Sequence, residues 1–140
     1  MNGWSRSSLA LFSTTPPSFS KTADRLGGQM AIELKLATPL PGSESTQREH
    51  LKVAVPNHPW LQPFEMSAFE LYIMAVFWQL SRDRQVEGMT GMPRGFSLQS
   101  FVFYQQLFDD VLNTDEIELL QHLDSVYLNA ITELRKDNNG

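Results

Sequence analysis

The chain has 140 residues, no cysteine and a net charge of −5. This length fits one domain, and the lack of cysteine excludes a disulfide framework, thiolate metal sites and cysteine nucleophiles. The negative charge argues against non-specific nucleic-acid binding, which depends on Lys and Arg neutralising phosphates. The longest apolar run, residues 71–78, is far shorter than the roughly 20 residues that span a membrane. We therefore expect a protein compatible with the cytoplasm, with no nucleic-acid or membrane partner.

Residues 1–29 are rich in serine and carry three basic residues against one acidic residue. This composition favours a disordered N-terminal extension, because Pro16, Pro17 and the many serines bury little apolar surface. Two alternatives are open. The segment could be an organellar transit peptide, since these are basic, serine-rich and poor in acids. Met30 could also be the natural start, because codons for the preceding glycines can carry a ribosome-binding sequence.

Residues 30–64 are predicted to form an extended or hairpin arm that ends in a proline-rich linker. Apolar and polar residues alternate from residue 32 to residue 36, which is typical of a strand with one solvent-facing side. A similar alternation at residues 50–55 could pair with the first strand as a small hairpin. A helix over residues 44–54 is the competing interpretation, because Glu, Gln, Arg and Leu favour helices. Three prolines between residues 56 and 63 exclude a helix or a central strand there.

Residues 65–136 are predicted to form a compact three-helix unit, so that the protein is mainly α-helical. Ser67 and Glu70 have the S-x-x-E spacing of a capping box, which marks the start of the first helix. The helix is then apolar without interruption over residues 71–78, so we expect it to be covered on most sides. It is the expected centre of the core.

Two further helices are expected to cover the first. Ser97 is predicted to cap a helix over residues 98–112, and Thr114 is predicted to start a third helix with acidic residues in its first turn. The expected core residues of the second helix are Phe101, Tyr104, Phe108 and Val111, at three- and four-residue spacing. Those of the third helix are Ile117, Leu120, Leu123, Tyr127, Ile131 and Leu134.

The residues that usually carry chemistry form no recognisable constellation. The three histidines lack metal-ligand spacing, and the chain has neither a nucleophile elbow nor a glycine-rich phosphate loop. The acid pairs Asp109-Asp110 and Asp115-Glu116 lie at predicted helix ends, where solvation and the helix dipole explain them better than acid–base catalysis does. We expect no enzymatic activity and no cofactor.

The loop between the first two predicted helices is a candidate binding surface. It combines arginines, which are favoured at interfaces, with methionines, whose flexible side chains suit adaptable apolar contacts. Aromatic residues of the proline-rich linker could add anchors. The predicted partner-binding residues are Arg82, Arg84, Met89, Met92, Arg94, Trp60 and Phe64. Alternatively, the arginines solvate the helix end while the methionines and the two aromatic residues pack onto the core.

Three segments resemble a known family. Residues 77–82 read FWQLSR, residues 91–97 follow the pattern G-x-x-x-G-F-S, and residues 118–134 read ELLQHLDSVYLNAITEL. Over about residues 68–134 this order is similar to a small family of phage tail assembly chaperones. In that family a helix ending in Gln-Trp-Arg precedes glycines, a Gly-Leu-Asp-Tyr-like helix start and a final amphipathic helix. Here Trp78 precedes Gln79, and Phe96-Ser97 stands where Leu-Asp is usual.

The resemblance implies a cytoplasmic, non-enzymatic helper encoded by a tailed phage or prophage. Such a helper binds the tape-measure protein and keeps its long hydrophobic helices from aggregating before the tail tube polymerises. The alternative is a small phage or bacterial regulator that binds a host protein or DNA through Arg82, Arg84 and Arg94.

Overall fold

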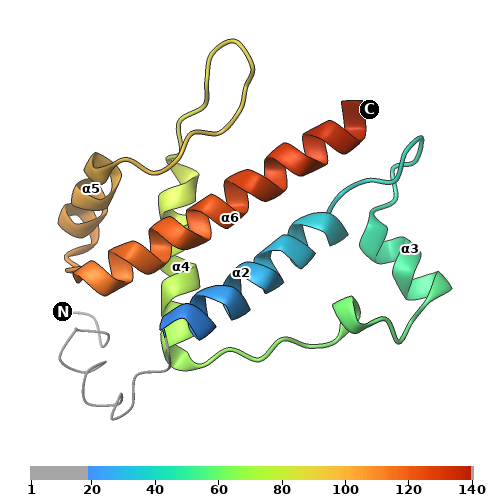
Figure 1. Ribbon diagram of the computed structural model, residues 1–140, viewed down its shortest axis with the longest axis horizontal. Coiled ribbons are helices and arrows are strands. Elements are labelled where there is room, and N and C mark those ends of the chain that lie inside the picture. The colour runs from blue at the N-terminus through green and yellow to red at the C-terminus, as the bar shows by residue number, and fades with distance from the viewer. Residues whose placement is uncertain (1–18, 140) are drawn as a thin grey trace.

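The computed structural model describes residues 19–139, which form five α-helices and one 3₁₀ turn (Figure 1). The elements are α2 (Phe19–Leu36), α3 (Gln47–Ala54), η1 (Pro59–Leu61), α4 (Ala68–Arg82), α5 (Leu98–Phe108) and α6 (Thr114–Asn139). Within this range the only extended pairing is two isolated bridges, Pro39 with Thr46 and Val86 with Pro93. The prediction of a mainly α-helical protein is confirmed.

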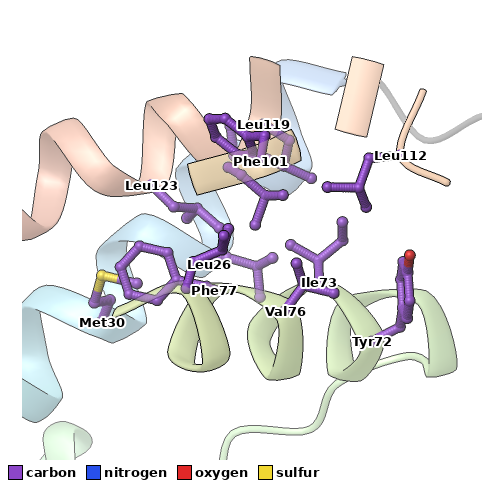
Figure 2. Close-up of a cluster of buried hydrophobic side chains, with 13 residues drawn as sticks. Leu26, Met30, Tyr72, Ile73, Val76, Phe77, Phe101, Leu112, Leu119 and Leu123 are labelled. Carbon is purple, nitrogen blue, oxygen red and sulfur yellow. The ribbon is translucent and has the colours of Figure 1, made fainter. Parts of the chain in front are cut away.

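The long helices α2 and α6 lie side by side and run in the same direction, and α4 crosses them (Figure 1). Figure 2 shows that side chains from α2, α4, α5 and α6 converge on one core. The core residues from α2 are Ala23, Leu26 and Met30. The expected unit of three helices is therefore incomplete, because α2 supplies a fourth wall.

The predicted strand over residues 32–36 is wrong, because these residues form the last turns of α2. Ala23, Leu26 and Met30 are three or four positions apart and all lie in the core, which is the helical period rather than the strand period. The predicted boundary between residues 29 and 30 falls inside this helix. Disorder is therefore the wrong prediction for residues 19–29, and its remaining part, residues 1–18, lies outside the described residues.

The helical interpretation of the next segment is confirmed, and the hairpin is wrong. Thr46 caps α3 by accepting a hydrogen bond from the Glu49 amide at 3.3 Å. No residue of α3 is buried, so the helix is not held in place by packing in the core. An ion pair between Arg48 and Glu33 of α2 joins it to the rest of the molecule.

The capping box at the start of α4 forms as predicted. The Glu70 amide donates to Ser67 Oγ at 3.2 Å, and the Ser67 amide donates to Glu70 Oε1 at 2.9 Å. The expected cover on most sides of α4 is absent from one face, where Leu71 is 54% and Trp78 is 43% exposed. The buried apolar residues of the helix are Tyr72, Ile73, Val76, Phe77 and Leu80.

Helix α5 is shorter and more exposed than predicted. Ser97 caps it as expected, accepting from the Ser100 amide at 3.1 Å, but the helix ends at Phe108 instead of residue 112. Asp109 adopts a left-handed conformation with φ 48°, which turns the chain away. Of its expected core residues only Phe101 is buried, and Val111 no longer follows the helical face.

Helix α6 carries the predicted apolar stripe, and its most buried residues are Leu119, Leu120 and Leu123. Its start is a second capping box. The Asn113 amide donates to Glu116 Oε1 and the Glu116 amide donates to Asn113 Oδ1, both at 2.8 Å.

The two adjacent glycines of α2 provide a matched pair of predictions. A Cβ at Gly27 would lie 3.1 Å from Val126 Cγ2 of α6, whereas a Cβ at Gly28 would meet nothing within 4 Å. We expect Gly28→Ala to raise the free energy of unfolding by about 0.5–1 kcal/mol, because glycine is costly inside a helix. We expect Gly27→Leu to lower it by about 1–3 kcal/mol through overpacking. Urea denaturation of both variants checks this, and equal effects would contradict the close approach of α2 to α6.

Candidate partner-binding site

A pocket of about 410 Å³ lies between α2, the linker that follows η1, and α4. We name it the linker pocket. The predicted residues Trp60 and Phe64 both line it. Most of the remaining apolar wall is made by Leu26, Met30, Leu61, Pro63, Met66, Met74 and Trp78. The structure thus brings two of the predicted contact residues together around one opening.

Two cation–π contacts fix the linker alongside α2. Lys35 Nζ lies 5.5 Å from the centre of the Trp60 ring, and Arg25 Cζ lies 4.3 Å from the centre of the Phe64 ring. Lys35 is near the end of α2 and Arg25 is nearer its start, so the linker runs back along the helix. The pocket wall is therefore attached to α2 at both ends.

Arg25 also ties the start of α4 to α2. Its Nη1 lies 2.6 Å and 2.5 Å from the two carboxylate oxygens of Glu70, and its Nη2 donates to the Glu65 carbonyl. Burial opposes ionisation of Glu70, but the hydrogen bonds from the Ser67 amide and from Arg25 outweigh it and hold the pKa of Glu70 below its ordinary value. The carboxylate therefore stays charged and anchors the guanidinium.

The pocket lining includes four polar residues, namely Gln29, Glu33, Arg48 and Gln62. Gln29 Nε2 donates to Glu33 Oε1 at 3.1 Å, and Glu33 also pairs with Arg48 of α3. The rest of the lining is apolar and includes three methionines and three aromatic residues. This arrangement suits binding of an apolar group, with the polar residues orienting whatever is attached to it.

The methionines of the pocket and Trp78 were not predicted as contact residues. Met30, Met66 and Met74 lie on α2, the linker and α4, so no local pattern connects them. One hint was present in the sequence. The apolar run of residues 71–78 has no polar side, so some of its side chains, such as Trp78, had to lie outside the core unless every side of the helix was covered. Methionine side chains bend readily, so this wall can adapt to apolar groups of different shape.

Arg84 does not contact a partner as predicted, because its side chain is only 5% exposed. Its Nη1 lies 2.6 Å from Asp124 Oδ1 of α6, and its guanidinium lies over the rings of Phe96 and Tyr127, 4.2 Å and 4.5 Å from their centres. Asp124 Oδ2 accepts a second bond from the Phe96 amide at 2.8 Å. Arg84 is thus a structural residue that fixes the base of the loop between α4 and α5.

The rest of that loop projects from the helices as a narrow hairpin-like arm (Figure 1). Its two sides are joined by the Arg94 amide donating to Gln85 O and the Glu87 amide donating to Met92 O, each at 2.8 Å. Arg135 of α6 braces the arm by donating to the carbonyls of residues 90 and 91, both at 3.0 Å.

The other predicted contact residues of the loop lie on this arm or at its base. Met89 is at the tip and is 96% exposed, while Met92 is half-buried. Arg82 and Arg94 are exposed, and within residues 19–139 neither forms an ion pair with a carboxylate. The structure therefore leaves Met89, Arg82 and Arg94 accessible and removes Arg84 from the set.

The acid pairs are not simply solvated, as the sequence suggested. Asp110 is 4% and Glu116 is 3% exposed. The hydroxyls of Tyr72 and Tyr104 donate to Asp110 Oδ2 at 2.7 Å and 2.9 Å, and Glu116 serves the capping box of α6. Burial and the bond to Asp110 raise the pKa of both tyrosines above the ordinary value. Both tyrosines therefore stay protonated to well above neutral pH, and their bonds to Asp110 connect α4 and α5 with the segment before α6.

Comparison with protein families, curated proteins and solved structures gave no match. Among the residues described, no cluster of histidine and acidic side chains is arranged to hold a metal ion. No helix within residues 19–139 is both long enough and apolar enough to cross a membrane.

Proposed function

We propose that the protein is a non-enzymatic assembly helper that binds an apolar helical segment of another protein, in the manner of a phage tail assembly chaperone. The observation that carries the proposal is the linker pocket, with its methionines and tryptophans gathered from α2, the linker and α4. Large apolar side chains on an amphipathic helix are the usual occupants of such grooves.

The composition of the pocket suits a helper that meets many similar segments in turn. Its volume of about 410 Å³ falls within the range of specific binding sites and can take a large apolar side chain. Thioether walls repack around different side chains, which is the property of promiscuous binding surfaces. The exposed faces of Leu71 and Trp78 on α4 extend the apolar surface beyond the pocket.

The proposed partner is the tape-measure protein, in the cytoplasm of the host cell. The family resemblance supplies this partner, and the pocket supplies the means of holding its hydrophobic helices. The regulatory alternative loses support because Arg84, one of its three arginines, is buried against Asp124. No single observation in the described residues favours it.

Co-expression with the product of a neighbouring tape-measure gene tests the proposal. We expect co-purification and a larger soluble fraction of the tape-measure protein. Trp60→Ala should weaken the complex by about 30-fold, because a buried aromatic anchor contributes roughly 2 kcal/mol or more. The matched control is Val53→Ala, since Val53 is 85% exposed and lies outside the pocket.

Two outcomes would contradict the proposal. One is no gain of solubility and no co-purification with the tape-measure protein. The other is a complex that Trp60→Ala weakens no more than Val53→Ala does. Circular dichroism of both variants establishes that any loss of binding occurs in folded protein.

A further inference from the structure

Helix α5 has no charged residue, and most of its apolar residues are exposed. Only Phe101 is buried, whereas Leu98 is 71%, Phe103 is 54% and Leu107 is 77% exposed. A surface helix of a monomer normally shows charged or polar residues on its outer face. The outer face of α5 therefore has the composition of a face that is covered.

The exposed residues of α5 form one continuous half of the helix. With 3.6 residues per turn, Leu98 and Val102 lie along one edge, and Phe103 and Leu107 lie along the other. The residues between these edges are Gln99 and Gln106, whose amides both donate and accept hydrogen bonds. We name this surface the α5 face.

We propose that the α5 face binds the α5 face of a second copy of this chain. A two-fold interface needs a surface complementary to itself, and an apolar border around paired amides satisfies this. Each copy carries a net charge of −5, yet the α5 face brings no charged residues together. Two acidic copies can therefore associate through the α5 face without bringing like charges together at the centre of the interface.

The size of the face supports a stable pair. Four apolar side chains of the α5 face are at least 47% exposed, namely Leu98, Val102, Phe103 and Leu107, and the exposed Gln99 and Gln106 lie between them. Their combined exposed surface is on the order of several hundred Å², which approaches the roughly 800 Å² per partner of a standard interface.

The charge next to the face sets the orientation of the pair. Asp109 follows the last turn of α5 and is exposed. In an antiparallel pair, Asp109 of each copy lies beside the first turn of its partner's α5, where the helix dipole favours a carboxylate. A parallel pair would bring the two carboxylates together. The dimer is therefore antiparallel, with its two-fold axis near the middle of α5.

Size-exclusion chromatography with light scattering measures the particle mass of the full-length protein and so tests the dimer. No partner protein is added. We expect a particle of twice the 15.9 kDa chain mass at micromolar concentration. The double variant Phe103→Asp with Leu107→Asp should elute as a folded monomer, because it places four carboxylates in the interface. Val53→Asp on α3, at a position that is 85% exposed and lies outside the α5 face, should remain a dimer. A monomeric unmodified protein, or a double variant that stays dimeric, overturns the proposal.

A cross-link gives a second readout that does not depend on charge. Because the chain has no cysteine, Val102→Cys introduces a single thiol near the expected axis. Under oxidising conditions we expect a disulfide-linked dimer from Val102→Cys and no more than background from Val53→Cys. Equal cross-linking of the two variants overturns the proposal. The dimer is independent of the linker pocket, so loss of partner binding by Trp60→Ala leaves this result unchanged.

Discussion

Replacing Asp124 with alanine is expected to lower the free energy of unfolding by about 3–5 kcal/mol, because it leaves a buried charge without its counterion. The Arg84 side chain is 5% and the Asp124 side chain is 7% exposed, so water cannot replace the lost carboxylate. The variant also removes the acceptor of the Phe96 amide, which fixes the entry into α5. Urea denaturation followed by tryptophan fluorescence gives the value.

A double variant separates the ion pair from the packing around it. Arg84→Met together with Asp124→Leu removes both charges and keeps apolar volume, so we expect it to recover most of the stability lost by Asp124→Ala. Arg82→Ala is the control, since Arg82 is exposed at the end of α4, two residues before Arg84, and should change stability by no more than about 0.5 kcal/mol. If Asp124→Ala lowered the free energy of unfolding by less than about 1 kcal/mol, the Arg84–Asp124 ion pair would not be what stabilises the loop between α4 and α5.

Removing residues 1–29 is expected to cost most of the stability of the domain. A chain that starts at Met30 lacks Leu26, which is 1% exposed, Ala23, which is 5% exposed, and the Arg25 partner of Glu70. Loss of a fully buried leucine side chain alone costs about 2–5 kcal/mol, and whole domains have only about 5–15 kcal/mol. We therefore expect partial unfolding in circular dichroism at room temperature.

The point variant Leu26→Ala in the full chain isolates the packing part of this effect. It should lower the free energy of unfolding by about 2–5 kcal/mol, less than the truncation does. A chain starting at Met30 with an unchanged urea midpoint would contradict the packing of α2 against α6. It would then favour the interpretation of Met30 as the natural start.

The sequence alone determined the features that depend on neighbours three or four residues apart. The caps at Ser67 and Ser97 and the apolar stripe of α6 are local patterns, so they are readable without knowing the fold. The helical alternative for α3 belongs to the same class. The absence of a recognisable catalytic motif is also a statement about the sequence, and it left partner binding as the leading interpretation.

Burial was decided only by the tertiary structure. Residues 32–36 alternate like a strand, yet the helix that begins at Phe19 continues through them because its other residues pack on α6. Arg84 was expected at the surface, but in the folded chain its Nη1 lies 2.6 Å from Asp124 Oδ1 and its side chain is buried. Phe108 and Val111 were expected in the core, but α5 ends at Phe108 and Asp109 turns the chain, and the two side chains are 42% and 64% exposed.

The linker pocket illustrates the same division. Trp60 and Phe64 could be named from the sequence, because aromatic residues between prolines are conspicuous. Their companions Met30 and Met74 could not, since they lie on separate helices in otherwise ordinary apolar faces. Hydrogen-bonded caps are encoded within one turn of chain, whereas a pocket or an exposed face depends on which distant helices meet. The sequence thus determined where most helices start, and the packing of α2, α4 and α6 decided which surfaces remain for a partner.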